Sequence, residues 1–166
     1  MKIVYVNGLH GEKSTKPKKL SDILNREITH IVYDYEKHQG LYIEDLFDAL
    51  DKEQPDVIIA SSTGAYLVRE YCFTRSVALI ALNPVIDIEK TFRQIEENID
   101  IPYQYMTKYN HSISELVLVN LDDEVINPEE TIQTLNNVLV FEKGGHRFSN
   151  LEETKGEIEH FLNFLV

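Results

Sequence analysis

One segment, from Asp56 to Val68, constrains the fold of this chain more than any other. It begins with the apolar run Val57-Ile58-Ile59, passes through several small residues and then changes to apolar side chains at roughly helical spacing. A short apolar run of this kind is typical of a strand that is buried on both faces of a parallel sheet. The segment therefore predicts a strand, a tight turn and a helix in direct succession.

The turn between them has the pattern of a nucleophile elbow. Residues 60–64 read Ala-Ser-Ser-Thr-Gly, which fits G-x-S-x-G with alanine in place of the first glycine. In such an elbow the serine has a strained backbone, and the residues two before and two after it must be small. This register makes Ser62 the candidate nucleophile and leaves Ser61 as a spacer. The alternative is a Ser/Thr-rich N-cap on an ordinary strand–helix connection.

Length and composition indicate a soluble globular protein with one domain, residues 1–166. Of these residues 43% are hydrophobic and 27% are charged, the balance expected of such a domain. The formal charge of −12 argues against a nucleic-acid partner, because a polyanion requires a basic surface. The same charge favours uncharged or cationic leaving groups in a substrate. The clustered lysines are interpreted as a solvated loop; they are Lys13, Lys16, Lys18 and Lys19.

The remaining composition points to a reducing, cytoplasmic setting. The one cysteine, Cys72, excludes an internal disulfide framework and fits the apolar pattern of the helix after Gly64. The N-terminal apolar run is too short for a signal sequence, and no apolar run reaches membrane length. We therefore expect a cytoplasmic protein with no membrane partner.

Strand-like and helix-like segments alternate along the whole chain. Besides the segment above, strands are expected at Lys2–Val6, His30–Tyr35, Val77–Leu82, Leu116–Leu121 and Val138–Phe141. Because these strands are apolar throughout, they predict a mostly parallel sheet with helices on both faces. The expected fold class is therefore α/β, with about six strands in a three-layer arrangement. Residues 85–114 are the only stretch with room for a lid, so we expect a minimal lid or none. The site should then be shallow and open and prefer short or flexible acyl groups.

Three residues with complementary chemistry follow three of these strands. Ser62 follows the third strand, Asp123 the fifth and His146 the sixth. The carboxyl ends of parallel strands meet at one edge of a sheet, where sites in such folds gather. The chain order serine, aspartate, histidine is that of an α/β-hydrolase triad. The sequence therefore predicts a proton relay in which His146 serves Ser62 and Asp123 orients His146.

The first loop and the elbow supply the remaining parts of the predicted site. The backbone N–H of Thr63, the residue after the nucleophile, and that of Leu9 in the first glycine loop are the expected oxyanion donors. His10 lies beside them in sequence and is a candidate substrate contact. Asp122 and Glu124 are alternatives to Asp123 as the acid.

Other residues are weaker candidates. His30 is expected to open a strand at the opposite end of the sheet, and His160 to face outward late in the last helix. His38 and His111 are further competitors for the role of base. No H-x-x-x-H or Cys/His spacing indicates zinc, so we expect neither a metal nor a cofactor.

Five places in the chain carry a resemblance to a known family. They are Tyr5-Val6-Asn7-Gly8-Leu9, Ile59-Ala60-Ser61-Ser62-Thr63-Gly64, Leu82-Asn83-Pro84-Val85, Asp123-Glu124-Val125 and residues 142–148, Glu-Lys-Gly-Gly-His-Arg-Phe. On these residues the chain resembles the small, lidless YqiA-type bacterial esterases of the α/β-hydrolase superfamily. The resemblance implies hydrolysis of small acyl esters or thioesters, with Ser62, Asp123 and His146 as the matching triad.

The chain departs from the pattern of that family at three positions. Asn7 stands where the family usually has histidine, Ala60 replaces the first elbow glycine, and Ala65 replaces a glycine common after Gly64. These departures motivate a second hypothesis, a catalytically silent binding protein on a hydrolase scaffold. The tyrosines between Tyr103 and Tyr109 would then be a partner-facing surface. A third hypothesis keeps the triad but assigns it acyl transfer or C–C cleavage.

Overall fold

Six parallel strands form one sheet in the computed structural model, which describes residues 1–34, 43–95 and 113–166. The strand order is β2-β1-β3-β4-β5-β6, and each strand pairs in parallel with its neighbours. The strands are β1 (Ile3–Val6), β2 (Ile28–Ile31), β3 (Val57–Ser61), β4 (Ala78–Leu82), β5 (Glu115–Asn120) and β6 (Val138–Phe141). The predicted α/β class with a parallel six-stranded sheet is confirmed.

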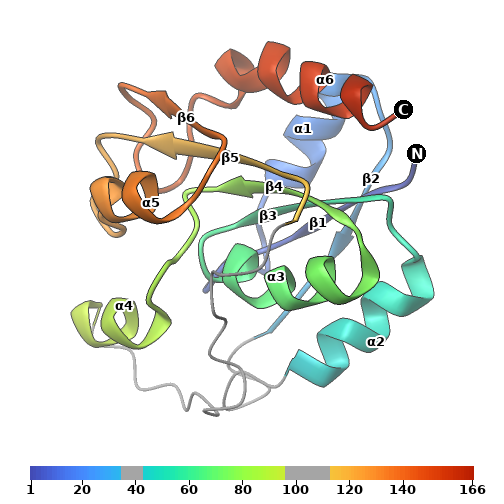
Figure 1. The fold of residues 1–166 in the computed structure, drawn as a ribbon, viewed down its shortest axis with the longest axis horizontal. Helices are drawn as coiled ribbons and strands as arrows, with labels where there is room; N and C mark the ends of the chain where they lie inside the picture. Colours follow the sequence, from blue (N-terminus) through green and yellow to red (C-terminus); the bar gives the residue numbers. More distant parts are fainter. Residues whose placement is uncertain (35–42, 96–112) are drawn as a thin grey trace.

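Helices cover both faces of this sheet (Figure 1). They are α1 (Lys16–Leu24), α2 (Ile43–Glu53), α3 (Thr63–Arg75), α4 (Ile88–Gln94), α5 (Pro128–Thr134) and α6 (Lys155–Phe164), with a short 3₁₀ helix η2 (Leu151–Thr154). Alternate residues of β3 point into two cores, since side chains of a strand alternate between faces. Ile58 packs with the apolar residues of α2 and α3, whereas Ile59 packs with those of α1 and α6.

The apolar character of the central strands follows from this double coverage. Every residue of β3 and of β4 is buried, so neither strand has a wet face that polar side chains could occupy. None of the described helices is long and apolar enough to cross a membrane.

The second strand differs from its prediction. It was expected at His30–Tyr35 but runs from Ile28 to Ile31. Asn25 adopts the left-handed conformation, φ 49° and ψ 45°, and ends α1, so Ile28 joins the sheet instead of the apolar stripe of that helix. His30 therefore does not open the strand at the far end of the sheet. It pairs with Tyr5 near the carboxyl edge, and the two rings stack edge to face at 5.4 Å.

Two other predictions fall partly or wholly outside the described residues. A lid, if any, was expected within residues 85–114; α4 lies in this stretch, and residues 96–112 lie outside the described residues. The tyrosines from Tyr103 to Tyr109 lie in that same stretch, as does His111, and His38 lies in residues 35–42.

A buried ion pair ties α3 to β5. The side chains of Arg69 and Glu115 are both 6% exposed, and Arg69 Nη2 donates to Glu115 Oε1 at 2.9 Å. Removal of one partner strands the other charge away from water, which is more costly than replacing both partners with apolar groups.

We therefore expect Glu115→Leu to lower the free energy of unfolding by about 3–5 kcal/mol, because Arg69 is left buried without its carboxylate. The double variant Arg69→Met/Glu115→Leu should be more stable than that single variant. Urea unfolding followed by far-UV circular dichroism measures both. A double variant less stable than Glu115→Leu alone would show that the buried charge of Arg69 is not the cause of the loss in Glu115→Leu.

Candidate active site

Ser62 lies on strained backbone between β3 and α3. Its φ of 52° and ψ of −124° fall outside the regions that non-glycine residues ordinarily occupy. Its N–H donates to the carbonyl of Leu82 at the end of β4, at 3.0 Å. The hydroxyl of the preceding Ser61 is instead turned inward, 2.8 Å from the hydroxyl of Tyr5. The two serines therefore have different surroundings, and only the side chain of Ser62 is partly exposed.

The elbow requires glycine at position 64 because α3 begins directly against the end of β1. A Cβ at Gly64 would lie 2.4 Å from the carbonyl oxygen of Asn7 and 3.0 Å from that of Val6. The sequence predicted a close approach between the residues two before and two after the serine. The closest atoms instead belong to β1 and the residue after it, so the limit on size at this position comes from a neighbouring strand.

Asp123 and His146 are brought together at the carboxyl edge of the sheet. Nδ1 of His146 lies 2.9 Å from Oδ2 and 3.0 Å from Oδ1 of Asp123. The side chain of Asp123 is 1% exposed and that of His146 is 20% exposed. Oδ1 of Asp123 also accepts the N–H groups of Val125 and Ile126, each at 2.8 Å. The carboxylate is thus fixed by its own loop and holds the imidazole ring at Nδ1, which leaves Nε2 on the opposite side of the ring.

The two alternative acids contact the backbone of the same histidine loop. Asp122 Oδ1 accepts the N–H of Gly145 at 2.7 Å, and Glu124 Oε2 accepts the N–H of His146 at 2.9 Å. The hydrogen bond from Gly145 holds the pKa of Asp122 below its ordinary value. All three consecutive acidic residues therefore position this loop, and Asp123 is the one at the ring.

Three asparagines hold the other side of the loop, and two of them, Asn83 and Asn120, are buried. The carbonyl of Gly145 accepts Nδ2 of Asn83 at 3.0 Å and Nδ2 of Asn120 at 3.1 Å. Asn150 Nδ2 donates to Oδ1 of Asn120 at 3.0 Å. Gly144, with φ 154°, fits closely beside them, since a Cβ there would lie 2.1 Å from Oδ1 of Asn150. None of these asparagines was predicted as a site residue; for Asn83 and Asn120, placement at the ends of β4 and β5 was the available signal.

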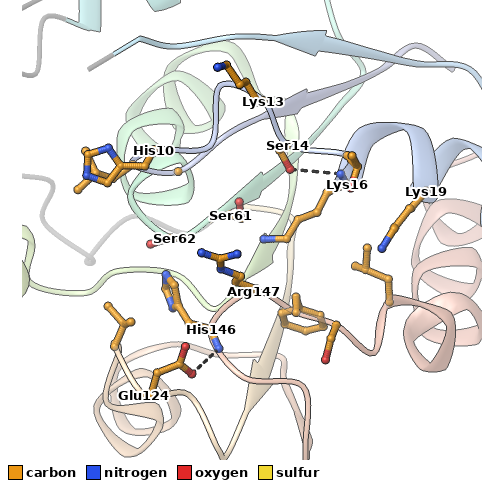
Figure 2. A pocket seen from close by; sticks show the side chains of 17 residues that line it. His10, Lys13, Ser14, Lys16, Lys19, Ser61, Ser62, Glu124, His146 and Arg147 are labelled. Carbon is orange, nitrogen blue, oxygen red and sulfur yellow. Dashed lines mark hydrogen bonds between the residues drawn. The ribbon is translucent and has the colours of Figure 1, made fainter. Parts of the chain in front are cut away.

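Ser62 and His146 line the same cavity, which has a volume of about 680 Å³ (Figure 2). No hydrogen bond joins their side chains within the described part of the chain. Leu9 and His10 line this cavity as well. The N–H of Leu9 donates to Oγ1 of Thr63 at 2.8 Å, so one expected oxyanion donor is engaged by the threonine hydroxyl.

The cavity also contains basic residues that the sequence analysis assigned to a solvated loop. Lys13, Lys16 and Lys19 line it, together with Arg147, whereas Lys18 does not. The spacing of Lys16 and Lys19 was the available signal, because residues three apart on a helix share a face and both lie on α1.

The remaining histidine candidate, His160, does not line the cavity described above. His160 is exposed in α6, as predicted. Within residues 1–34, 43–95 and 113–166, no group of three or more histidine, cysteine, aspartate or glutamate side chains could hold a metal ion.

Comparison with known proteins shows similarity in structure but not in sequence. No protein-family model matches the chain, and no curated protein matches it. Est1E from Butyrivibrio proteoclasticus is similar in structure, with a TM-score of 0.76 at 13% identity, over 98% of this chain and 87% of that one. The esterase domain of a Rhodothermus marinus protein has a TM-score of 0.67 at 15% identity, over 98% and 86%. Mouse alpha/beta hydrolase domain-containing protein 10 has the same TM-score and identity, over 99% and 90%.

These likenesses show that the chain has the α/β-hydrolase fold. Within that fold, the structure places a strained serine and an aspartate–histidine pair on one edge of the sheet, beside one cavity.

The close approach at Gly64 yields a test of the elbow. We expect Gly64→Ala to lower the free energy of unfolding by about 1–3 kcal/mol, because the added methyl meets backbone atoms that cannot move aside. Gly156 in α6 is a matched control, since a Cβ there would meet nothing within 4 Å. Gly156→Ala should raise the stability by up to about 1 kcal/mol through helix propensity. Thermal unfolding of both variants separates the two; equal stability of Gly64→Ala and the wild type would contradict the packing described.

The asparagine cluster yields a test that depends on pH. Asn120 is fully buried, and Asn120→Asp replaces the amide that donates to Gly145 with an oxygen. We expect a loss of about 1–3 kcal/mol in the free energy of unfolding at about pH 8. Burial raises the folded-state pKa of the new carboxyl above its unfolded value, so the loss should shrink as the pH falls toward about 4. The exposed Asn136 gives the control variant Asn136→Asp; a loss in Asn120→Asp that does not change with pH would argue against this account.

Proposed function

We propose that this protein is a serine hydrolase that cleaves small carboxylic esters or thioesters through Ser62, His146 and Asp123. The observation that carries the proposal is the aspartate–histidine pair at 2.9 Å beside the cavity that also holds the strained Ser62. The esterases among the structural neighbours support the same class of reaction.

In the proposed mechanism, Ser62 Oγ attacks the carbonyl carbon of the substrate while Nε2 of His146 takes the hydroxyl proton. Asp123 accepts a hydrogen bond from Nδ1–H of His146, which selects the tautomer with a free Nε2 and stabilises the imidazolium. The protonated His146 then gives its proton to the departing alcohol or thiol, and an acyl-serine remains. Water, deprotonated by His146, attacks that ester, and the acid leaves as Ser62 recovers its proton.

The negative charge on the tetrahedral intermediate would be met by the backbone N–H groups of Thr63 and Leu9. Each donor of this kind contributes about 3 kcal/mol to stabilisation of the transition state. Because Leu9 N–H donates to the Thr63 hydroxyl at 2.8 Å, we propose that the oxyanion displaces this hydroxyl when substrate binds. His10, on the same cavity, is proposed as a substrate contact.

The proposal extends to the family, the cellular location and the substrate class. The motifs around Ser62, Asp123 and His146 favour the YqiA-type esterases as the family, and the single cysteine favours a cytoplasmic location. We propose that the substrates have short acyl groups and that no cofactor takes part.

One observation favours the alternative of a catalytically silent binding protein. No hydrogen bond joins Ser62 to the ring of His146 in the described residues. Catalytic hydrogen bonds of ligand-free enzymes are often long and tighten when substrate binds. The hydrolase proposal therefore retains the stronger support, because a binding protein would not require an aspartate that fixes the ring of His146.

Labelling with a fluorophosphonate probe separates the two hypotheses. We expect the wild type to be labelled at Ser62 and to hydrolyse p-nitrophenyl acetate, and we expect Ser62→Ala to lose both. Asp123→Asn should lower kcat by a factor on the order of 10⁴, because His146 then adopts the wrong tautomer. Ser61→Ala is the matched control and should still be labelled. Labelling that persists in Ser62→Ala would exclude Ser62 as the nucleophile.

A further inference from the structure

The cavity beside Ser62 is basic although the chain as a whole is acidic. The sequence has 16 lysine and arginine residues against 28 aspartate and glutamate residues. Among the described residues, the charged side chains that line the cavity are nevertheless four cations and one carboxylate. They are Lys13, Lys16, Lys19, Arg147 and Glu124. Such a concentration of one charge in a cleft focuses the field on a ligand of the opposite sign.

Two of these cations converge from different elements. Lys16 begins α1, and Arg147 directly follows His146 after β6. Figure 2 shows the ammonium group of Lys16 directed toward the guanidinium group of Arg147, between the two serines and His146. In the part of the chain that the structure describes, neither side-chain cation forms a hydrogen bond or an ion pair with a protein group. By contrast, Arg69, Arg75 and Arg93 have carboxylate partners; those partners are Glu115, Asp51 and Glu89.

The electrostatics of Lys16 reflect this arrangement. Burial, and next the charge of Arg147, lower the pKa of Lys16 from 10.5 to about 8, while Asp123 acts in the opposite direction. Two neighbouring cations without a counterion repel each other, and an anion bound between them would remove that cost.

The nearby carboxylates are committed to other contacts. Asp123 is buried against His146, and Glu124 accepts the N–H of His146. The start of α1 adds to the positive potential, because its first turn contains no acidic residue. The anion that balances Lys16 and Arg147 is therefore not supplied by the described residues around the cavity.

We propose that the substrate of this site is an ester or thioester that carries a second, anionic group, a carboxylate or a phosphate, held between Lys16 and Arg147. This inference rests on the proposed hydrolase function and specifies its substrate class. Guanidinium and ammonium groups suit such a ligand, since a fork of N–H donors and a point charge together match the oxygens of an anion. It replaces the expectation of uncharged or cationic leaving groups, because the local charge of the cavity is opposite in sign to the net charge.

Paired esters that differ only in the anion test the proposal. One pair, p-nitrophenyl butyrate and p-nitrophenyl hemisuccinate, places the charge on the acyl group. The other, methyl p-acetoxybenzoate and p-acetoxybenzoate, places it on the leaving group. We expect kcat/KM to favour the anionic member of at least one pair by about ten-fold or more. A preference for the neutral member in both pairs would overturn the proposal.

Variants locate the effect on the two cations. Lys16→Met and Arg147→Met should each lower the ratio of anionic to neutral kcat/KM by about ten-fold, and Lys16→Arg should restore much of it. Lys18→Met is the matched control, because Lys18 lies on the same helix but does not line the cavity. Its ratio should stay that of the wild type. An equal fall of the ratio in Lys18→Met would show a general charge effect and contradict a specific site.

Binding to the Ser62→Ala protein separates this inference from the hydrolase proposal. Isothermal titration with succinate and with inorganic phosphate requires no turnover and distinguishes the two kinds of anion. Anion binding to Ser62→Ala that is lost in Ser62→Ala/Lys16→Met, together with a wild-type protein that cleaves no ester, would support the anion site and refute the hydrolase. Turnover of esters without any preference, and without binding of either anion, would refute the anion site and leave the hydrolase standing.

The affinity for succinate should fall as the pH rises through about 8, because Lys16 loses its positive charge there. Succinate is suited to this measurement since both of its carboxyl groups stay ionised above about pH 7. The charges that act on Lys16 are those of Arg147 and Asp123; His10, Lys13, Lys19, Glu124 and His146 are the other charged or titratable groups that line the cavity. Lys16→Arg stays cationic and should bind succinate with less dependence on pH; an unchanged profile would exclude Lys16 as the group that titrates.

Discussion

The packing of α3 against the end of β1 is the constraint on which the rest of the site depends. The carbonyl of Asn7 lies so close to position 64 that only glycine fits, which brings the start of the helix directly beside the first strand. Ser62, one step before the helix, is forced into a conformation with positive φ. Strain of this kind persists only where the surrounding structure fixes it. The same packing therefore presents the hydroxyl of Ser62 to the cavity.

Asn7 links this packing to the neighbouring strand. It is fully buried, and its side chain donates to the carbonyls of Gly8 and Tyr33 at 2.9 Å each and accepts the N–H of Tyr33 at 2.9 Å. The first loop, with Leu9 and the lysines beyond it, is thus fastened to the segment after β2. Asparagine at this position, where the resembled family has histidine, forms a complete set of contacts rather than leaving a gap.

The histidine loop is held by a different means, hydrogen bonds between polar side chains and backbone. Asparagines from the ends of β4 and β5 hold one carbonyl of the loop, and the consecutive acids after β5 hold two N–H groups and the ring. These carboxylates are engaged by the histidine loop, whereas Lys13, Lys16, Lys19 and Arg147 line the cavity.

The sequence by itself determined the class of the fold, the number of strands and the elements that carry Ser62, Asp123 and His146. It could do so because a continuous apolar run followed by polar residues is a local property of the sequence. A strand that is buried on both faces has to be apolar throughout, so such runs mark the strands of a parallel sheet. Only the tertiary structure decided which of three adjacent acids reaches the ring, why position 64 is glycine and where β2 begins. It also decided that lysines at the start of α1 and Arg147 after β6 line one cavity. Each of these depends on atoms brought together from distant parts of the chain, and side-chain contacts across a sheet leave no periodic trace in sequence. The net charge of −12 did not reveal the basic lining of the cavity, because a sum over the whole chain carries no information about which side chains share a cavity.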